Sequence, residues 1–254
     1  MQCLQSWRNG DETMRRVSWF SCGAASAVAT ALSKPDVIAY CEVGSEHEDN
    51  KRFMADCVKW FEKEITMLKN PKFKDTWEVW EKKSYLAGIA GAPCTLELKV
   101  KPRLDFQRPD DIHIFGYTAD GPDIKRAKGM GEHWPDLKTE FPLIERGITK
   151  AACLAIIEDV GIKPPLTYAL GFPNANCLPC VKAQSPSYWA LIRKEFPEKF
   201  NRMVKLSRKL DVRLCVIKGE RAFIDEIPQN HKTTKPLAPE CDFLCSLAEQ
   251  DLIK

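Results

Sequence analysis

The sequence has no long apolar run and no strong excess of charge of one sign. No stretch approaches the ~20 apolar residues that cross a membrane, and the first residues, MQCLQSWRNGDETMRR, show no apolar core of the kind found in secretion signals. A net charge of +3 does not indicate a dedicated nucleic-acid binder, although it is compatible with a nucleotide ligand or a local nucleic-acid contact. We therefore expect a soluble, cytoplasmic protein without a membrane partner.

Cysteine, in contrast, is abundant. Eleven cysteines in 254 residues is a high and odd number, and in a long chain without a secretion signal reduced thiols are expected instead of a disulfide framework. They can serve as core residues, metal ligands or redox groups. With 44% hydrophobic residues, the chain can bury one large core or two modest ones.

Residues 17–33, VSWFSCGAASAVATALS, combine a short β-like run with a turn of small residues that opens into an apolar helix. Small side chains let an anion approach the backbone, and the first helical turn presents unpaired N–H groups and the positive end of the helix dipole. The stretch therefore predicts a phosphate-binding cradle, with a plain strand-to-helix crossover as the alternative. The residues of the cradle are Ser21, Cys22, Gly23, Ala24, Ala25 and Ser26.

Alternating strand and helix patterns predict an α/β fold around a parallel sheet. Strands are expected at 17–20, 37–41, 65–68 and 111–118, and helices are expected to begin near 50, 75, 94 and 149. Short strand–helix–strand units imply right-handed crossovers, which place a ligand crevice at the carboxyl ends of the strands. A smaller, mainly helical region follows, with helices at 185–196 and 197–210 and a hairpin at 212–227. We expect two domains, 1–150 and 151–254.

Charged side chains follow the expected strand ends. The acidic loop 42–50 comes directly after the second strand, and a carboxylate such as Glu42 could hold a ribose hydroxyl or a magnesium ion; a solvated loop ahead of a helix is the alternative. Lys99 lies on the second turn of a helix, and Lys125 and Arg126 follow the fourth strand. These cations suit a phosphate or sulfate, while an ordinary surface pair is the default interpretation.

Two closely spaced cysteine pairs lie far apart in the chain. Cys177 and Cys180 form a CxxC knuckle, and Cys241 and Cys245 form a second pair downstream. A turn can bring two sulfurs together and the fold must bring the other two, so the four cysteines predict a tetrahedral thiolate site. Zinc and a [4Fe-4S] cluster use the same ligands, and the spacing does not separate them. A redox thiol among the four, or cysteines that only fill the core, are the alternatives.

Several of these segments resemble one family, in the same order. SCGAAS after a strand resembles the PP-loop of adenine nucleotide alpha-hydrolase-like proteins, whose common form is SGGxDS, and CEVGSEHEDNKRF resembles the acidic segment of phosphoadenosine phosphosulfate (PAPS) reductases. CTLELKVKP and GYTADGPDIKR resemble later substrate-site segments, and NANCLPCVK with PECDFLC is typical of a PAPS reductase-like branch carried by phages and mobile elements. The resemblance covers roughly residues 15–245 and implies a Rossmann-like, HUP-type PP-loop domain that binds ATP or PAPS.

The resemblance also implies roles for single residues. Ser21, Gly23, Ala24 and Ser26 match the phosphate-contacting loop, Gly44 matches the glycine after the second strand, and Lys99 and Arg126 match basic substrate-site positions. Two positions depart from the family pattern. Ala25 stands where many PP-loop ATP pyrophosphatases have aspartate, and Glu42 stands near the family's Asp-Thr-Gly. Alanine does not coordinate a cation, so magnesium-dependent cleavage of ATP has the least support.

Three functions stay open. We favour an adenine nucleotide-dependent enzyme of sulfur transfer or substrate adenylation, in which Lys99 and Arg126 neutralise charge and the four cysteines hold an iron–sulfur cluster. The second is a PAPS or APS reductase with Cys241 as nucleophile, a role that a metal-bound Cys241 would not have. The third is a non-catalytic accessory protein with a structural zinc and a nucleotide- or nucleic-acid-binding surface at 182–209. Expected partners are the nucleotide and a nucleic-acid or protein acceptor of sulfur, and a homodimer is left open.

Overall fold

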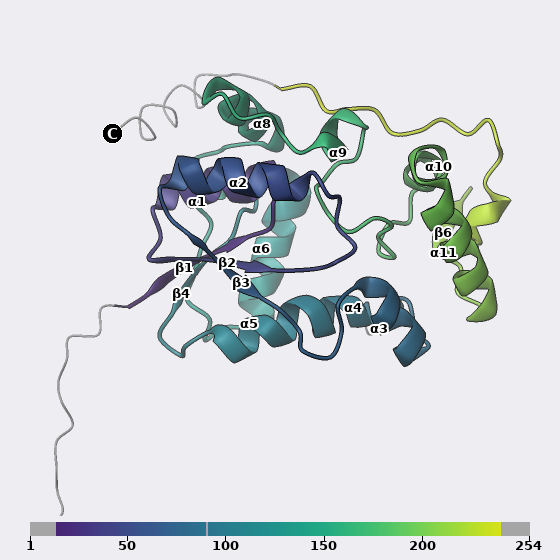
Figure 1. Ribbon diagram of the computed structural model, residues 1–254, viewed down its shortest axis with the longest axis horizontal. Coiled ribbons are helices and arrows are strands. Elements are labelled where there is room, and N and C mark those ends of the chain that lie inside the picture. Colours follow the sequence, from purple (N-terminus) through teal and green to yellow (C-terminus); the bar gives the residue numbers. More distant parts are fainter. Residues whose placement is uncertain (1–13, 90, 240–254) are drawn as a thin grey trace, which may run out of the picture.

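A five-stranded sheet forms the centre of the chain, of which the computed structural model describes residues 14–89 and 91–239. Its strand order is β3-β2-β1-β4-β5 (Figure 1). The strands are β1 (Arg16–Phe20), β2 (Val37–Cys41), β3 (Ile65–Leu68), β4 (Ile112–Ile114) and β5 (Thr139–Glu140). All neighbouring pairs are parallel, with Val17 opposite both Val37 and His113 in the register. The predicted α/β class with a parallel sheet is confirmed.

Helices cover the sheet and continue beyond it. Helices α1 (Ala24–Ser33) and α2 (Asn50–Phe61) lie on one side, and α5 (Lys101–Phe106) lies on the other (Figure 1). The remaining helices of the sheet region are α3 (Thr76–Lys83), α4 (Pro93–Thr95), α6 (Gly121–His133), α7 (Pro142–Glu145), α8 (Lys150–Asp159) and α9 (Leu166–Ala169). In the described ranges no helix combines the length and the apolar composition needed to span a bilayer.

The last described part forms a smaller lobe beside the sheet (Figure 1). It contains α10 (Pro186–Glu195), α11 (Pro197–Lys209) and a hairpin of β6 (Cys215–Ile217) and β7 (Glu220–Ala222). The hairpin is shorter than the predicted 212–227. Its two-residue turn has Lys218 and Gly219 at φ 50° and 91°, the geometry of a tight primed turn, and a 3-10 turn at Ile224–Glu226 then ends the ladder.

Two large apolar cores hold most of these elements. In the first, α1 and α8 pack together over the sheet, with Phe20, Val28, Phe53, Ile156 and Ile157 all buried. The small side chains of α1 allow this close approach, and α8 has an N-terminal cap, because the Thr149 hydroxyl accepts the N–H of Ala152 at 3.2 Å. Such a cap contributes about 1 kcal/mol of helix stability.

The second core joins helix α3 to the C-terminal lobe. Trp77 and Trp80 are buried together with Trp189, Phe200 and Met203. Each core therefore combines residues from both sides of the predicted boundary at residue 150. The two-domain division itself stays a prediction.

The fourth strand is also shorter than predicted, because β4 ends at Ile114 instead of continuing to residue 118. Its neighbour β5 has only two residues and was not predicted. After Ile114 the chain leaves the sheet and passes across the first turn of α1, which brings residues 115–117 to the predicted cradle.

Candidate functional site

The cradle lies where the direction of the chain through the sheet reverses. Strands β1, β2 and β3 follow one another to one edge, and the chain then returns to place β4 on the other side of β1. Ligands of open parallel sheets bind at such a point, beyond the carboxyl ends of the strands. Here the segments after β1 and β4 touch through their backbones: a Cβ atom added to Gly116 would lie 2.5 Å from Cα and 2.7 Å from the nitrogen of Ser26.

The turn between β1 and α1 has an unusual backbone and a hydroxyl network. Cys22 has φ 54°, a left-handed conformation that is uncommon for a residue with a side chain and often marks functional sites. The Ser26 hydroxyl accepts the N–H and the hydroxyl of Ser21, both at 3.1 Å, and donates to the carbonyl of Gly23 at 2.9 Å. The N–H of Ala24 donates to the Tyr168 hydroxyl at 3.2 Å. These hydrogen bonds fix the first turn of α1 beyond the carboxyl end of β1.

A cavity of about 380 Å³ opens in front of this turn, a volume within the range of small-molecule sites. Hydroxyls, cations and aromatic rings converge on it from separate elements. Its polar and aromatic lining includes Ser21, Ser26, Glu46, Lys99, Arg103, Arg126, Trp19, Phe115 and Tyr117. Phosphate-binding groups and flat apolar surfaces therefore face the same space.

Lys99 and Glu46 form an ion pair inside this cavity. The ammonium lies 3.5 Å from Oε1 of Glu46, whose side chain is 5% exposed, while Oε2 accepts the Tyr40 hydroxyl at 2.6 Å and the Asn50 amide at 3.0 Å. Burial lowers the pKa of Lys99, but the neighbouring acidic groups Cys177 and Glu46 raise it by more, so this pKa lies above its ordinary value. Lys99 sits in a π-helical turn, Leu96–Val100, a distortion that is frequent at functional sites.

The aromatic side of the cavity is also fixed by contacts. Trp19 donates its indole N–H to Nδ1 of His113 at 2.9 Å, and the two rings stack at 5.9 Å. Burial lowers the pKa of His113, which favours the neutral imidazole that can accept this bond. Across the cavity the Arg126 guanidinium lies 4.7 Å above the ring of Tyr117 and donates to Asp123 at 2.9 Å. The two rings and the guanidinium offer flat surfaces to a ligand.

A second compartment of about 250 Å³ adjoins the first and holds three thiols. Cys94, Cys177 and Cys180 line it. The two compartments share Thr95, Lys99, Arg126 and Asn176. Burial raises the pKa of Cys177 to about 12 and also raises that of Cys94, so both are neutral thiols near pH 7. Lys99 therefore lies between the CxxC knuckle and the cradle cavity.

Backbone contacts tie the knuckle to its neighbours. The N–H of Leu178 donates to the carbonyl of Ser45 in the acidic loop at 2.9 Å. The N–H of Cys180 donates to the hydroxyl of Tyr188 on α10 at 2.7 Å. The acidic loop after β2 and the C-terminal lobe thus position the two thiols together.

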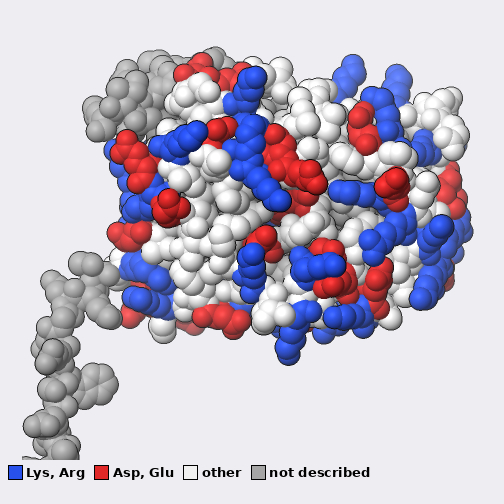
Figure 2. All heavy atoms as spheres, viewed as in Figure 1, with Lys and Arg blue, Asp and Glu red and all other residues white. Residues whose placement is uncertain are grey.

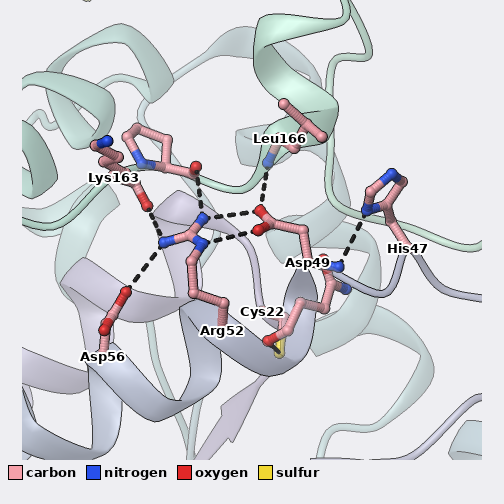
Figure 3. Close-up of polar contacts among 9 residues, drawn as sticks. Cys22, His47, Asp49, Arg52, Asp56, Lys163 and Leu166 are labelled. Carbon is pink, nitrogen blue, oxygen red and sulfur yellow. Dashed lines mark hydrogen bonds and ion pairs between the residues drawn. The ribbon is translucent and has the colours of Figure 1, made fainter.

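A side-chain clamp holds the start of α2 against the segment before α9 (Figure 3). The Arg52 guanidinium donates to both oxygens of Asp49 at 2.7 and 2.8 Å and to the carbonyls of Lys163 and Pro164 at 3.0 and 3.1 Å. Asp49 also accepts the N–H of Leu166 at 2.7 Å, and the bond from Arg52 holds the pKa of that carboxyl below its usual range. The clamp fixes α9, which carries the tyrosine that contacts the start of α1.

The structure brings together only part of the residues expected from the sequence. Ser21, Ser26, Lys99 and Arg126 line the cradle cavity, and Cys177 and Cys180 line the adjoining compartment. Glu42 instead pairs with Lys69, and Gly44 packs on the backbone of Lys74, where an added Cβ would lie 2.8 Å from the carbonyl oxygen. Cys22, Gly23, Ala24 and Ala25 shape the turn without lining the cavity. The binding roles of all these residues stay predictions.

The four-cysteine site is tested only in part. Cys241 and Cys245 lie outside the described residues. Within residues 14–89 and 91–239, no group of three or more histidine, cysteine or acidic side chains has the arrangement needed for a metal ion. The described residues therefore supply two of the four thiols that the sequence predicts for a metal or cluster.

Several residues of the site were missed in the sequence. Glu46 lies in the acidic loop and is the carboxylate that reaches the cavity, Arg103 follows Lys99 by one helical turn, and Cys94 joins the CxxC pair. Their segments had been identified, but the spacing did not show which side chains point inward. Tyr168 gave no local signal, because its contact with Ala24 joins positions 144 residues apart.

The fold and the site define a parallel α/β protein with a cationic cavity at the switch point of its sheet. Among solved structures, the chain is similar to the PAPS reductase from Candida auris in its phosphate complex, with 11% sequence identity over 65% of this chain and 82% of that chain and a TM-score of 0.49. No protein-family model matches the sequence, and no curated protein matches it.

Proposed function

We propose that the cradle cavity binds an adenine nucleotide, ATP or PAPS, and that the protein is an enzyme of sulfur transfer or substrate adenylation. One observation carries this proposal: a single cavity of about 380 Å³ is lined both by the first turn of α1 and by Lys99, Arg103 and Arg126. Polyphosphate or phosphosulfate groups need several donors and cations at once, and a helix start with nearby lysine and arginine supplies them. A phosphate or sulfate group would lie at Ser21 and Ser26.

The rings of the cavity support a nucleotide over a simple anion. Trp19, Phe115 and Tyr117 offer faces on which a purine can stack, on the side of β1 and β4. Glu46 is the carboxylate on the described lining, but its oxygens are engaged by Lys99, Tyr40 and Asn50. The described lining of the cavity therefore does not fit a magnesium ion held by protein carboxylates.

The position of Lys99 supports chemistry at the junction of the two compartments. Its ammonium faces the cradle cavity on one side and the thiols Cys177 and Cys180 on the other. A nucleotide phosphate and a sulfur-bearing group would therefore meet next to it. Lys99 and Arg126 would stabilise negative charge that develops on the transferred group, the usual task of cations in group transfer from nucleotides.

Nucleotide binding tests the proposal directly. We expect ATP or PAPS to bind, as measured by titration calorimetry, and Ser26→Ala to weaken the binding about tenfold, because the hydroxyl that ties Ser21 and Gly23 into the turn is lost. Ser33→Ala is the matched control, since Ser33 lies at the other end of α1, and it should leave the affinity unchanged. Failure of the unmodified protein to bind either nucleotide would contradict the proposal.

The metal content tests the four-cysteine prediction separately. We expect anaerobically purified protein to be brown and to contain iron and sulfide, and a Cys177→Ser, Cys180→Ser double variant to lose both, because two ligands are removed. Cys215→Ala is the control: this thiol is buried in the core of the same lobe. A colourless protein with stoichiometric zinc would indicate a structural site instead, and no bound metal of either kind would rule out the predicted four-thiolate site.

A further inference from the structure

Positive charge is concentrated on the C-terminal lobe. Residues 182–239, here called the basic lobe, contain 13 lysines and arginines against 6 aspartates and glutamates, a net charge of +7. The whole chain has a net charge of +3, so the rest of the sequence is negative by 4. This segregation is hidden in the overall composition, and a surface of one sign attracts a partner of the opposite sign.

Many of these cations are exposed on α11 and on the hairpin. Arg202, Lys205 and Lys209 follow each other at intervals of three and four residues, which places them on one face of α11. Lys218 and Arg221 are exposed on the hairpin. Figure 2 shows several blue side chains on the right-hand side of the molecule, over this lobe, with red side chains among them. The exposed cations therefore come from two elements of the lobe and are more than a single pair.

Part of this charge is already neutralised within the chain, and part is not. Lys194 pairs with Glu195, Arg202 with Glu81, Arg208 with Asp225 and Glu226, and Arg213 lies 3.7 Å from Asp211. Lys205, Lys209, Lys218 and Arg221 have no ion pair within the described residues. These four side chains are available to an anionic partner.

The basic lobe also reaches the thiol compartment. Lys182 lines that compartment. The ammonium of Lys199, at the start of α11, lies 5.3 Å above the ring of Phe196. It is close enough to Glu48 and Cys177 to interact with them electrostatically. A polyanion that follows α11 would thus end at the entrance to the proposed site.

We propose that the basic lobe binds the phosphate backbone of a nucleic acid, with Lys205, Lys209 and Arg221 as contacts. A nucleic acid presents regularly spaced negative charge that matches a row of cations along a helix. A membrane surface fits less well, because a stretch that lies on a membrane combines its cations with exposed apolar side chains that enter the lipid. Leu237 is the one large hydrophobic residue that the described part of this lobe exposes. The binding itself is independent of the proposed nucleotide chemistry; the nucleic acid's role as sulfur acceptor rests on that proposed function.

Fluorescence anisotropy with labelled single-stranded DNA, single-stranded RNA and duplex DNA over a salt series tests this inference. We expect saturable binding at low salt to at least one of them. A Lys205→Glu, Lys209→Glu, Arg221→Glu variant should bind about tenfold more weakly or worse and should lower the slope of log affinity against log salt by about 2–3, since each phosphate contact contributes ~0.7–0.9. Its affinity for ATP or PAPS should not change.

The matched control carries the same change of net charge on the sheet region, outside the basic lobe. Lys51, Lys59 and Lys72 are exposed there, and a Lys51→Glu, Lys59→Glu, Lys72→Glu variant should keep most of the nucleic-acid affinity. Equal weakening in both variants would overturn the inference, because only net charge would matter. It would also be overturned if the unmodified protein bound none of the three nucleic acids, or bound only vesicles of phosphatidylserine and phosphatidylcholine.

Discussion

Replacing Gly116 with alanine is expected to raise the dissociation constant for the nucleotide about 100-fold and to lower the free energy of unfolding by about 1–3 kcal/mol. The added methyl carbon would lie 2.5 Å from Cα and 2.7 Å from the nitrogen of Ser26, and 2.9 Å from the carbonyl carbon of Ala25. All three are backbone atoms and cannot rotate away. The first turn of α1 must therefore shift, and Ser26 shifts with it. Calorimetric titration and urea unfolding measure the two effects.

Gly129→Ala provides the matched control for this substitution. Gly129 lies inside helix α6, where an added Cβ meets nothing within 4 Å. Alanine there should leave nucleotide affinity unchanged and should raise the free energy of unfolding by about 0.5–1 kcal/mol, because it is the better helix former. A Gly116→Ala protein with unchanged affinity and stability would show that the segments after β1 and β4 do not meet as described.

The elements around the cradle could be predicted because their signals are local. The apolar runs of β1 and β2 and the small residues of α1 each lie within a dozen neighbouring residues, and all are present in the structure. The two-residue strand β5 is too short to show a period, and β4 ends early because of a contact with α1 that the sequence of β4 alone does not encode.

The inward-facing residues of the acidic loop could not be predicted in the same way. Glu42 and Glu46 have the same chemistry and lie in the same loop, so composition gives no reason to prefer either. The choice depends on contacts with other segments: the N–H of Glu42 donates to the carbonyl of Leu68 at 2.8 Å, which places Glu42 beside Lys69, and the N–H of Gly44 donates to the carbonyl of Lys74. Glu46 then points to Lys99. Contacts between distant segments determine which side chains line the cavity. The spacing of residues along the chain does not predict these contacts.

Replacing Lys99 with methionine is expected to produce the largest loss of function. Methionine keeps the length of the side chain and removes the charge, so a charge-assisted bond to the bound phosphate or sulfate is lost. We expect the dissociation constant for ATP or PAPS to rise about 30- to 100-fold, corresponding to about 2–3 kcal/mol, and turnover to fall further if Lys99 stabilises the transferred group. Calorimetry and product analysis under saturating nucleotide separate the two losses.

Lys83→Met is the matched control for Lys99→Met, because it removes a lysine charge outside the cavity. Lys83 pairs with the buried Glu97 at 3.1 Å, as Lys99 pairs with the buried Glu46, but it does not line either compartment. It should therefore reduce stability at most and leave nucleotide affinity intact.

The pH dependence of nucleotide affinity gives a second check on the role of Lys99. Because the pKa of Lys99 is raised, its charge persists as the pH rises past the ordinary lysine value of about 10.4, so affinity should hold through that pH and fall only above it. Unchanged affinity in the Lys99→Met protein would place the phosphate away from this side chain.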